Sequence, residues 1–485
     1  MNEMLRKSIT TLNDGLFLYY LGSNLIYLFL LIFAIRASVI HQRQLASIRL
    51  ERYRASPFSP PVSVIAPAHN EGQSIVQSVY SFLSLEYPAV EVIVVNDGSS
   101  DDTLEALTRE FRLLRTDLPY VQEVACRPVR GVYMSQTEPR LLVVDKEAGG
   151  SKADATNAGL NIASSPYVCV LDADSLLEKD ALLRVMVPVL SDPLRVVAAG
   201  GIVRAVNGSV VEGGQLKKVR LPRRFVEIVQ VVEYLRAFLV GREGWGHFNM
   251  LMIISGAFGV FRRDLVREVG GYRPAAIGED FDLMMRLHRT LRVNGMDYRA
   301  CFVPDPVCWT EVPPDWKSLG KQRSRWQKGL VDTLWLNRDM LFRPRYGRIG
   351  AVALPNLWLY EALAPAVEFT GLAAIGAAAF LGILSRRFLM LFLLFGYAFS
   401  TMLSIGGVLL EEITYRRYGD WREVAKLILC CFAEHFPYHH MHLWWRLRGM
   451  WQYARGDVAW GRMTRVGFGG ALASRAVQGW RTGKQ

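Results

Sequence analysis

The fold is decided by one stretch, Val62-Ser-Val-Ile-Ala-Pro67, which is followed at once by the polar run Ala68-His69-Asn70-Glu71-Gly72. A short apolar run of this kind is typical of a buried strand, and the polar residues after it open a helix. The same pattern returns at Val92-Ile-Val-Val95, which ends in Asn96 and Asp97. We therefore expect strands that alternate with helices, which is the organisation of an α/β domain.

Two more strands continue this pattern. The third is predicted at Leu141-Leu-Val-Val-Asp145 and leads to the turn Gly149-Gly-Ser-Lys152; the fourth is predicted at Tyr167-Val-Cys-Val-Leu171 and leads to Asp172-Ala-Asp174. Ligands of open parallel sheets bind at the carboxyl ends of the strands, beside the positive ends of the following helices. The four polar edges are therefore expected to converge on one site.

The residues at this edge favour a metal-bound diphosphate. Neither a P-loop nor a G-x-G-x-x-G turn follows any strand, which argues against an NTPase and a dinucleotide enzyme. Asp172 and Asp174 point the same way from a strand end and can offer oxygens to Mg²⁺ or Mn²⁺, while substrate phosphates complete the coordination. The alternative for this Asp-x-Asp is a solvated turn whose carboxylates cap a helix.

The composition indicates a membrane protein. The chain has 485 residues, of which 51% are hydrophobic and 21% are charged, with a formal net charge of +12. So much apolar surface is more than a soluble core requires, so part of it is expected to face lipid. The basic residues are heaviest beside the apolar runs, which favours contact with anionic membrane lipid and no nucleic-acid partner.

The first apolar run, residues 16–35, is long enough to span a bilayer, and the basic residues that follow it predict a cytoplasmic C-terminal side. We interpret residues 1–55 as an uncleaved transmembrane anchor with a basic linker. Residues 56–340 contain no run that could span and are expected to form a cytoplasmic domain.

The remaining residues, 341–485, are expected to begin with interfacial helices that lead into a transmembrane hairpin at about 357–382 and 388–410. Glu361 and Glu368 lie inside the first of these runs and should face the helix bundle or a water-filled path through it. Residues 424–445 are predicted to lie in the interface or re-enter, and the basic tail is predicted to be cytoplasmic. The sequence thus predicts a multi-pass protein of the inner (plasma) membrane with three crossings.

Three further motifs follow in the soluble region: Ser255-Gly-Ala-Phe-Gly-Val-Phe261, Gly278-Glu279-Asp280 and Gln322-Arg-Ser-Arg325-Trp326. Together with Asp97 and Asp172-x-Asp174, this ordered set resembles the processive family 2 glycosyltransferases, which are membrane synthases of cellulose, hyaluronan, chitin-like backbones and poly-N-acetylglucosamine. The resemblance covers residues 58–330 in motif detail. It implies a GT-A-like α/β nucleotide-sugar transferase domain joined to transmembrane helices.

On the donor side, the resemblance implies that Asp97 contacts the uracil end of a UDP-sugar and that Asp172 contacts the nucleotide. It assigns the divalent metal, Mg²⁺ or Mn²⁺, to Asp174, and it places Lys152 near the donor phosphates. The alternative for Lys152 is a solvated lysine beside a glycine-rich turn.

On the acceptor side, the resemblance implies that Asp280 is the catalytic base and that Gln322, Arg325 and Trp326 edge the acceptor. Trp326 would form a stacking floor for the terminal sugar, and Arg325 would supply charge to the leaving diphosphate. The alternatives are a helix-starting acidic cluster around Asp280 and an interfacial Trp326 that pairs with Arg325.

The tail departs from the family pattern. Hyaluronan synthases carry a Trp-Gly-Thr-Arg gating motif, whereas here Trp460-Gly461 is followed by Arg462, and a Thr-Arg pair ends only at Arg465. A gate formed by Trp460, Arg462 and Arg465 is a hypothesis, and an interfacial basic helix is its alternative.

The predicted function is inverting transfer from a UDP-sugar, UDP-GlcNAc or UDP-glucose, to a growing β-linked polysaccharide that is exported through the membrane helices. Export or periplasmic proteins would be its partners. The alternative within enzymes is a non-processive transferase that adds one sugar to a lipid acceptor. A carrier or channel with a regulatory α/β domain is disfavoured, because three crossings are few and no inverted repeat is visible.

Overall fold

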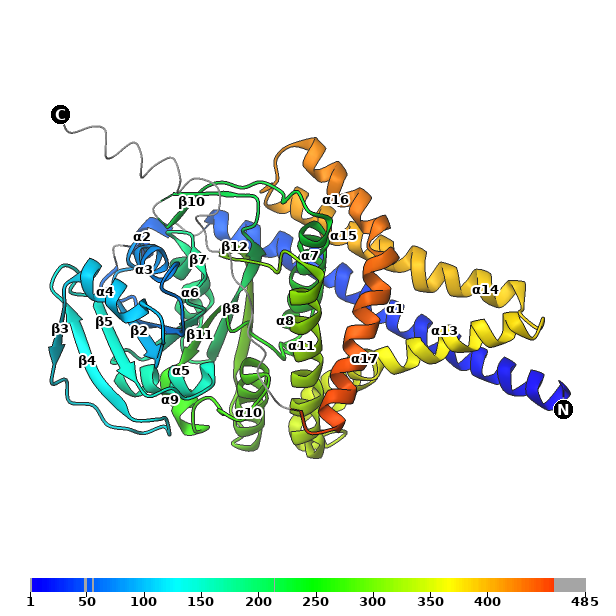
Figure 1. The fold of residues 1–485 in the computed structure, drawn as a ribbon, viewed down its shortest axis with the longest axis horizontal. Helices are drawn as coiled ribbons and strands as arrows, with labels where there is room; N and C mark the ends of the chain where they lie inside the picture. The colour runs from blue at the N-terminus through cyan, green and yellow to red at the C-terminus, as the bar shows by residue number, and fades with distance from the viewer. Residues whose placement is uncertain (1, 48–49, 55, 213, 458–485) are drawn as a thin grey trace.

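A computed structural model describes residues 2–47, 50–54, 56–212 and 214–457. An α/β domain occupies one end of the molecule, and a bundle of long helices extends from it (Figure 1). The domain is built on a ten-stranded sheet in the order β3-β4-β5-β2-β1-β6-β11-β8-β12-β7. Its strands are β1 (Val62–Ala68), β2 (Val90–Asp97), β3 (Leu113–Thr116), β4 (Val129–Ser135), β5 (Leu141–Lys146), β6 (Tyr167–Leu171), β7 (Leu176–Leu177), β8 (Val196–Ala205), β11 (Phe258–Arg262) and β12 (Arg299–Thr310). A separate hairpin pairs β9 (Val210–Glu212) with β10 (Gln215–Lys218).

The four predicted strands form the parallel centre of the sheet, β5-β2-β1-β6. Their registers align, with Val62 opposite both Val90 and Tyr167, and Asn96 opposite Asp145. The sheet as a whole is mixed, because β11 runs antiparallel to both β6 and β8. The carboxyl ends of the central strands therefore meet at one edge, as the sequence predicts.

Helices cover both faces of the sheet, so its central strands are buried on two sides. One face packs Ile75 and Phe82 of the helix after β1, and the other packs Leu160 and Leu283. The helices of the domain are α3 (Ile75–Leu83), α4 (Thr103–Phe111), α5 (Lys152–Ile162), α6 (Ala181–Ser191), α9 (Arg263–Glu268) and α10 (Glu279–Val293).

A middle layer of helices lies between the sheet and the most distant helices (Figure 1). It consists of α7 (Phe225–Leu235), η1 (Arg236–Arg242), α8 (Glu243–His247), α11 (Trp316–Leu336), α16 (Trp421–Ala433), η7 (His435–His439) and α17 (His440–Ala454). The short turns η2 (Arg338–Met340), η3 (Pro344–Tyr346), η4 (Ile349–Ala353), α12 (Leu354–Asn356) and η5 (Leu357–Ala362) follow α11. Long stretches of α11 and α17 are in contact, which brings the C-terminal helices against the segment Gln322–Trp326.

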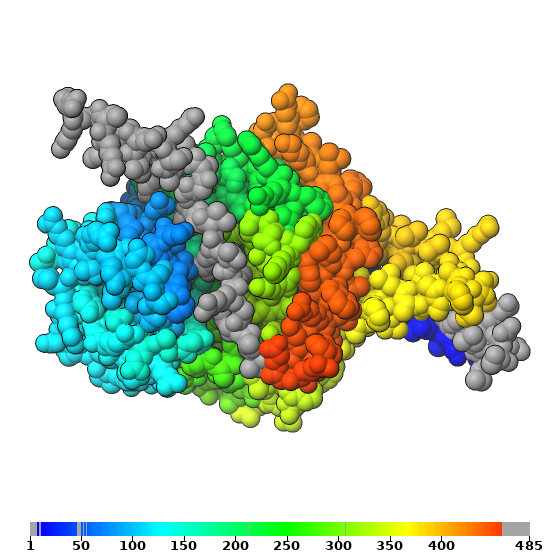
Figure 2. Space-filling view, in the orientation of Figure 1, coloured from blue at the N-terminus to red at the C-terminus, as the bar shows by residue number. Residues whose placement is uncertain are grey.

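An apolar arm projects from the body and is formed by α1 (Asn2–Ser47), α13 (Ala364–Phe380) and α14 (Arg386–Leu393), which continues through η6 (Leu394–Ala398) into α15 (Phe399–Thr414) (Figures 1 and 2). By length and composition, Thr11–Leu45 and Arg386–Thr414 could each cross a membrane. A third crossing is available if Ile349–Ala362 and Ala364–Phe380 act as one span, although they meet at a 43° bend. The predicted span 357–382 is therefore bent at residue 363, where the two helices meet. The short helix α2 (Leu50–Arg54) follows α1.

Both carboxylates of the predicted span face other helices. Glu361 accepts a hydrogen bond from the Tyr27 hydroxyl of α1, and Glu368 lies 2.5 Å from His439 Nε2. The arm is also fastened to the α/β domain, because Arg204 of β8 pairs with Glu411 of α15 and both side chains are only 2% exposed. Part of the apolar surface of α1 contacts protein in place of lipid, since Leu30 packs against Gly244 and is buried.

Candidate active site

Polar side chains from separate elements gather at the carboxyl edge of the central strands. Asp97 ends β2, Lys152 opens α5 after β5, and Asp172 follows β6 directly. These elements are neighbours because β2, β1 and β6 are adjacent in the sheet and β5 flanks β2. The residues predicted to bind the donor therefore come from strands that the fold holds side by side.

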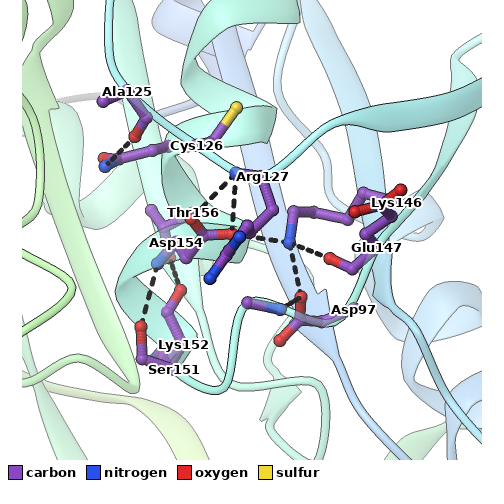
Figure 3. A network of polar contacts seen from close by, with 12 residues as sticks. Asp97, Ala125, Cys126, Arg127, Lys146, Glu147, Ser151, Lys152, Asp154 and Thr156 are labelled. Atoms are coloured by element: carbon purple, nitrogen blue, oxygen red, sulfur yellow. Dashed lines mark hydrogen bonds and ion pairs between the residues drawn. The ribbon is translucent and has the colours of Figure 1, made fainter.

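Asp97 is held by a lysine that the sequence analysis did not single out. Figure 3 shows Lys146, the last residue of β5, between Asp97 and Asp154. Its Nζ lies 2.6 Å from Asp97 Oδ1 and 2.6 Å from Asp154 Oδ2, and its side chain is 0% exposed. A buried ammonium needs such partners because an unpaired charge is costly away from water. The only signal in the sequence was a basic residue, after Asp145, at the end of a strand that begins with four apolar residues.

A second hydrogen-bond donor contacts the same oxygen of Asp97. The backbone N–H of Gly149 donates to Asp97 Oδ1 over 2.8 Å. Since both donors use Oδ1, the carboxylate has a fixed orientation and its other oxygen can accept a hydrogen bond from a ligand. The turn that supplies Gly149 leads straight into α5, so the group that orients Asp97 and the predicted phosphate ligand Lys152 belong to one segment.

Helix α5 begins with a local cap and a buried carboxylate. Ser151 is its N-cap and accepts a hydrogen bond from the backbone N–H of Asp154. The Asp154 side chain accepts from the backbone N–H of Arg127 over 3.0 Å, which ties the loop before β4 to the helix (Figure 3). The start of α5 is thus rigid, and its N–H groups and dipole favour an anion such as a diphosphate.

Lys152 and the predicted base Asp280 are joined through the backbone of Gly256. Lys152 Nζ pairs with Asp172 and donates to the Gly256 carbonyl over 2.6 Å, while the Gly256 N–H donates to Asp280 Oδ2 over 3.2 Å. A Cβ at position 256 would lie 3.1 Å from Lys152 Nζ, so glycine leaves room for this contact. Burial lowers the pKa of Lys152, but Asp172 and the acidic start of α10 raise it above its ordinary value. The ammonium therefore stays charged.

The acidic residues at the start of α10 differ in their surroundings. Asp282 is fully buried and pairs with Arg286 at 2.8 Å and with Arg273 at 3.1 Å, which makes it a structural residue. Asp280, by contrast, faces Gly256 and Lys152. Burial and then the charge of Asp280 raise the pKa of Glu279, while Lys152 and Arg325 lower it. The carboxylate predicted to be the base thus lies with the donor-side residues.

The Gln322–Trp326 motif lies on α11, which packs closely on the start of α10. A Cβ at Gly329 would lie 3.1 Å from the backbone nitrogen of Gly278, the residue before α10. Gln322 is buried, whereas Trp326 is 45% exposed and presents its ring to solvent. The charge of Arg325 lowers the pKa of Glu279, so Arg325 acts electrostatically on the start of α10. The helix that carries the predicted acceptor residues therefore packs against the helix that begins with Glu279 and Asp280.

Arg323, which lies between these motif residues, contacts two of them. Its Nη1 donates to Gln322 Oε1 over 3.2 Å, and its guanidinium carbon lies 4.1 Å from the centroid of the Trp326 ring. Arg323 is thus a cation–π partner of Trp326. The side chain of Arg323 is 1% exposed.

The carboxylate oxygens of Asp172 and Asp174 are suitable ligands for a divalent cation. Both residues follow β6 directly, and Asp174 is buried while Asp172 is partly exposed. Among the described residues, no group of three or more His, Cys, Asp or Glu side chains forms a metal cluster. Mg²⁺ characteristically takes one or two protein carboxylates and completes its shell with phosphate oxygens and water. The two carboxylates that follow β6 match that requirement.

The predicted gate residues Trp460, Arg462 and Arg465 lie outside the described part of the chain. Their role therefore stays a prediction. The described chain ends at residue 457, where the Asp457 carbonyl accepts a hydrogen bond from Lys328 of α11 over 3.2 Å. The last described residue of the chain thus lies beside α11.

Residues 60–329 match the family described as glycosyltransferase-like family 2. The chain belongs to glycosyltransferase family 2. The match spans the sheet, the carboxylate edge and the Gln322–Trp326 helix, and it confirms the predicted family, the enzyme class and the GT-A-like α/β domain.

Relatives of this family 2 glycosyltransferase include synthases of a polysaccharide. A poly-beta-1,6-N-acetyl-D-glucosamine synthase from Staphylococcus epidermidis is 28% identical over 268 residues, 55% of this chain and 54% of the relative. A probable glycosyltransferase, YdaM, from Bacillus subtilis is 30% identical over 272 residues, 56% of this chain and 55% of the relative. The chain spans about half the length of these curated relatives.

Among solved structures, the chain is similar to the mannosyltransferase PcManGT from Pyrobaculum calidifontis, which was solved in complex with GDP-Man and Mn²⁺. The two are 22% identical, the match covers 84% of this chain and 99% of that one, and the TM-score is 0.47.

Proposed function

We propose that this family 2 glycosyltransferase transfers a sugar from a UDP-sugar to a growing β-linked polysaccharide, with inversion at the anomeric carbon. The observation that carries the proposal is the chain of contacts from Asp172 through Lys152 and Gly256 to Asp280, which joins the donor edge to the base. The names of the synthase relatives support a polysaccharide product built from N-acetylglucosamine.

The donor site would recognise a nucleoside diphosphate sugar from both ends. The oriented carboxylate of Asp97 can accept the imide N–H of uracil through its second oxygen, because Lys146 and Gly149 both occupy the first. The charged Lys152 and the N-terminus of α5 would bind the diphosphate. UDP-GlcNAc is the expected donor, with UDP-glucose as the second choice.

The metal site proposed at Asp174, with Asp172 beside it, would hold Mg²⁺ or Mn²⁺. When bound, such a cation neutralises charge that develops on the leaving diphosphate. Arg325 would add a fixed positive charge on the acceptor side, in a site where charge is better stabilised by preorganised groups than by water.

Asp280 would act as the base. As the acceptor hydroxyl oxygen attacks the anomeric carbon, its proton passes to a carboxylate oxygen of Asp280, and the bond from that carbon to the diphosphate oxygen breaks. One displacement of this kind inverts the configuration. Gly256 holds Asp280 Oδ2 through its N–H, so the carboxylate is oriented before the acceptor arrives.

The acceptor end would rest against Gln322 and Trp326. An exposed indole offers a flat apolar face on which a sugar ring packs, and α11 holds it beside the start of α10. Such a floor retains the terminal sugar between rounds, which supports repeated addition to one chain.

The apolar helices support a location in the plasma membrane, with the α/β domain on the cytoplasmic side. Three crossings require the bent pair at 349–362 and 364–380 to act as one span. Polar groups at that depth face other helices, as Glu361 does toward Tyr27 and Glu368 toward His439. A polar interior of this kind would suit passage of a sugar chain outward, toward export or periplasmic partners.

The test is to incubate the full-length protein in lipid nanodiscs with a panel of radiolabelled UDP-sugars and Mg²⁺ or Mn²⁺, then separate the products by gel filtration and lipid extraction. High-molecular-weight product that a specific β-glycosidase degrades is expected. A single-sugar lipid adduct with no longer product would instead establish the lipid-glycosylating alternative.

A further inference from the structure

Arg323 connects the acceptor residues to helices far away in the sequence. While one side of its guanidinium reaches Gln322 and Trp326, its Nη2 donates to Glu233 Oε2 of α7 over 2.6 Å. The hydroxyl of Tyr438, in η7, donates to the same Glu233 oxygen over 2.6 Å. One carboxylate therefore receives Arg323 from the acceptor helix and Tyr438 from the C-terminal helices.

The anchor is rigid at both ends. Tyr438 is 3% exposed and stacks on His442 with ring centroids 5.6 Å apart and an interplanar angle of 10°. On the next helical turn of the α7 and η1 segment, Arg236 pairs with Glu434 at 2.8 Å. Glu233 is thus fixed on an element that is itself fastened to the C-terminal helices.

The rest of the acceptor helix is locked to α17 in the same region (Figure 2). Ser324 Oγ donates to the Trp445 carbonyl over 2.9 Å, and Arg446 Nε donates to Gln327 Oε1 over 2.8 Å. These contacts fasten α11 to α17 through the side chains of Ser324 and Gln327. Arg323 contacts two further side chains of the same helix, those of Gln322 and Trp326.

We propose that Arg323 is the positioning residue of the acceptor site: anchored by Glu233 and Tyr438, its guanidinium fixes Gln322 and Trp326 and so sets how often the acceptor, in place of water, receives the sugar. The inference rests on the proposed function in taking Gln322 and Trp326 as acceptor residues. The planar fork of arginine suits this role, since it can bond two partners in its plane while its face lies on an aromatic ring.

The experiment measures a partition ratio: sugar transferred to any acceptor divided by free sugar released by hydrolysis, with the sugar nucleotide that the wild-type protein turns over. The variants are Tyr438→Phe, Glu233→Gln and Arg323→Lys in full-length protein in nanodiscs. The matched control is Glu411→Gln, which weakens another buried Arg–Glu pair, that of Arg204, away from α11.

Each of the three variants is expected to lower the partition ratio by about 10- to 150-fold, the range of one charged hydrogen bond, while total donor consumption stays within about twofold. Glu233→Gln in an Arg323→Lys background should lower the ratio little further, because both changes weaken the same Arg323–Glu233 ion pair. The control should keep the wild-type ratio.

Two results would overturn the inference: folded variants with an unchanged ratio, or equal falls in transfer and hydrolysis, which would mark Arg323 as structural only. If Arg323→Lys fails to fold, Tyr438→Phe decides the matter, since it removes a single hydroxyl. Product length is measured separately from the partition ratio. A wild-type protein that makes only a lipid adduct would overturn the polysaccharide proposal. The ratio could still be measured, because it counts transfer to any acceptor.

Discussion

Lys146 Nζ lies 2.6 Å from Asp97 Oδ1, and the two side chains are 0% and 8% exposed. This pair determines which way the predicted base-recognition carboxylate faces, because Lys146 also bonds Asp154 and the Glu147 carbonyl and cannot shift alone. Strand pairing places it there, since Asp97 of β2 lies opposite Lys146 of β5.

Lys146→Met should therefore destabilise the protein and weaken donor binding together. Removing one partner of a buried ion pair leaves uncompensated charge and costs about 3–5 kcal/mol. Thermal unfolding and calorimetric titration with UDP should both change, whereas Lys217→Met, at an exposed position, should change neither. Normal UDP affinity in a folded Lys146→Met protein would contradict the link between this lysine and the nucleotide site.

Asp280→Asn should keep the shape of the site but remove the base. We expect kcat to fall by about 10²- to 10⁴-fold while binding of the UDP-sugar persists, because general-base catalysis acts on the transition state only. Turnover assays and equilibrium binding measure the two quantities. The control is Asp282→Asn, which should lower the Tm because Asp282 pairs with Arg286 and Arg273. Near-normal turnover by Asp280→Asn would show that another group removes the proton.

The elements that sequence predicted well are those fixed by local pattern. The apolar runs at 62–67 and 141–145 fold as β1, Val62–Ala68, and β5, Leu141–Lys146, because runs of β-branched residues favour buried strands. Strands β2 and β6, which flank β1, bring Asp97 and Asp172 to one edge. For these residues, the order of the motifs along the chain was enough to predict that they lie at the same edge of the sheet.

What could not be predicted depends on contacts between distant segments. The antiparallel insertion of β11 between β6 and β8 leaves no periodic signal, because its residues Phe258–Arg262 are buried on both sides. Likewise, Lys146 and Arg323 look like ordinary basic residues until β2 and α7 supply Asp97 and Glu233. Partners chosen by tertiary packing are invisible in a single sequence.

Glu279 should give the protein a pH-dependent stability. Burial, and then the charge of Asp280, raises its pKa, so the folded protein holds a proton at pH values where the unfolded chain has lost it. Its contribution to stability is therefore full below about pH 4.3, the ordinary value, and is lost as the pH rises through the folded pKa. Glu279→Gln should flatten the dependence of Tm on pH above that value, whereas Glu105→Gln, at an exposed position, should not. An unchanged profile in Glu279→Gln would rule Glu279 out as its source.

Asp174→Ala should weaken the response to divalent cations. A carboxylate that binds a cation at the diphosphate contributes to donor affinity only when the cation is present. Titration of UDP binding with Mg²⁺ or Mn²⁺ should therefore show a large enhancement in the wild-type protein and little in the variant. Asp180→Ala, a surface carboxylate that pairs with Arg184, serves as the control. If the cation titration of Asp174→Ala matched the wild type, the metal would have to bind elsewhere.

Trp326→Ala tests the acceptor floor against a control on the same helix. Trp335 also lies on α11, is 52% exposed and has Arg338 over its ring at 4.6 Å, much as Trp326 is 45% exposed with Arg323 at 4.1 Å. Loss of a stacking contact comparable to the ~0.5–1.5 kcal/mol of an aromatic pair should shorten the product, because the terminal sugar leaves more often between rounds. Hydrolysis of the donor should continue, since water can replace the acceptor hydroxyl. Product length by gel filtration should therefore fall in Trp326→Ala and stay unchanged in Trp335→Ala. Equal shortening in both would mean that helix packing, and not the indole at position 326, sets the length of the chain.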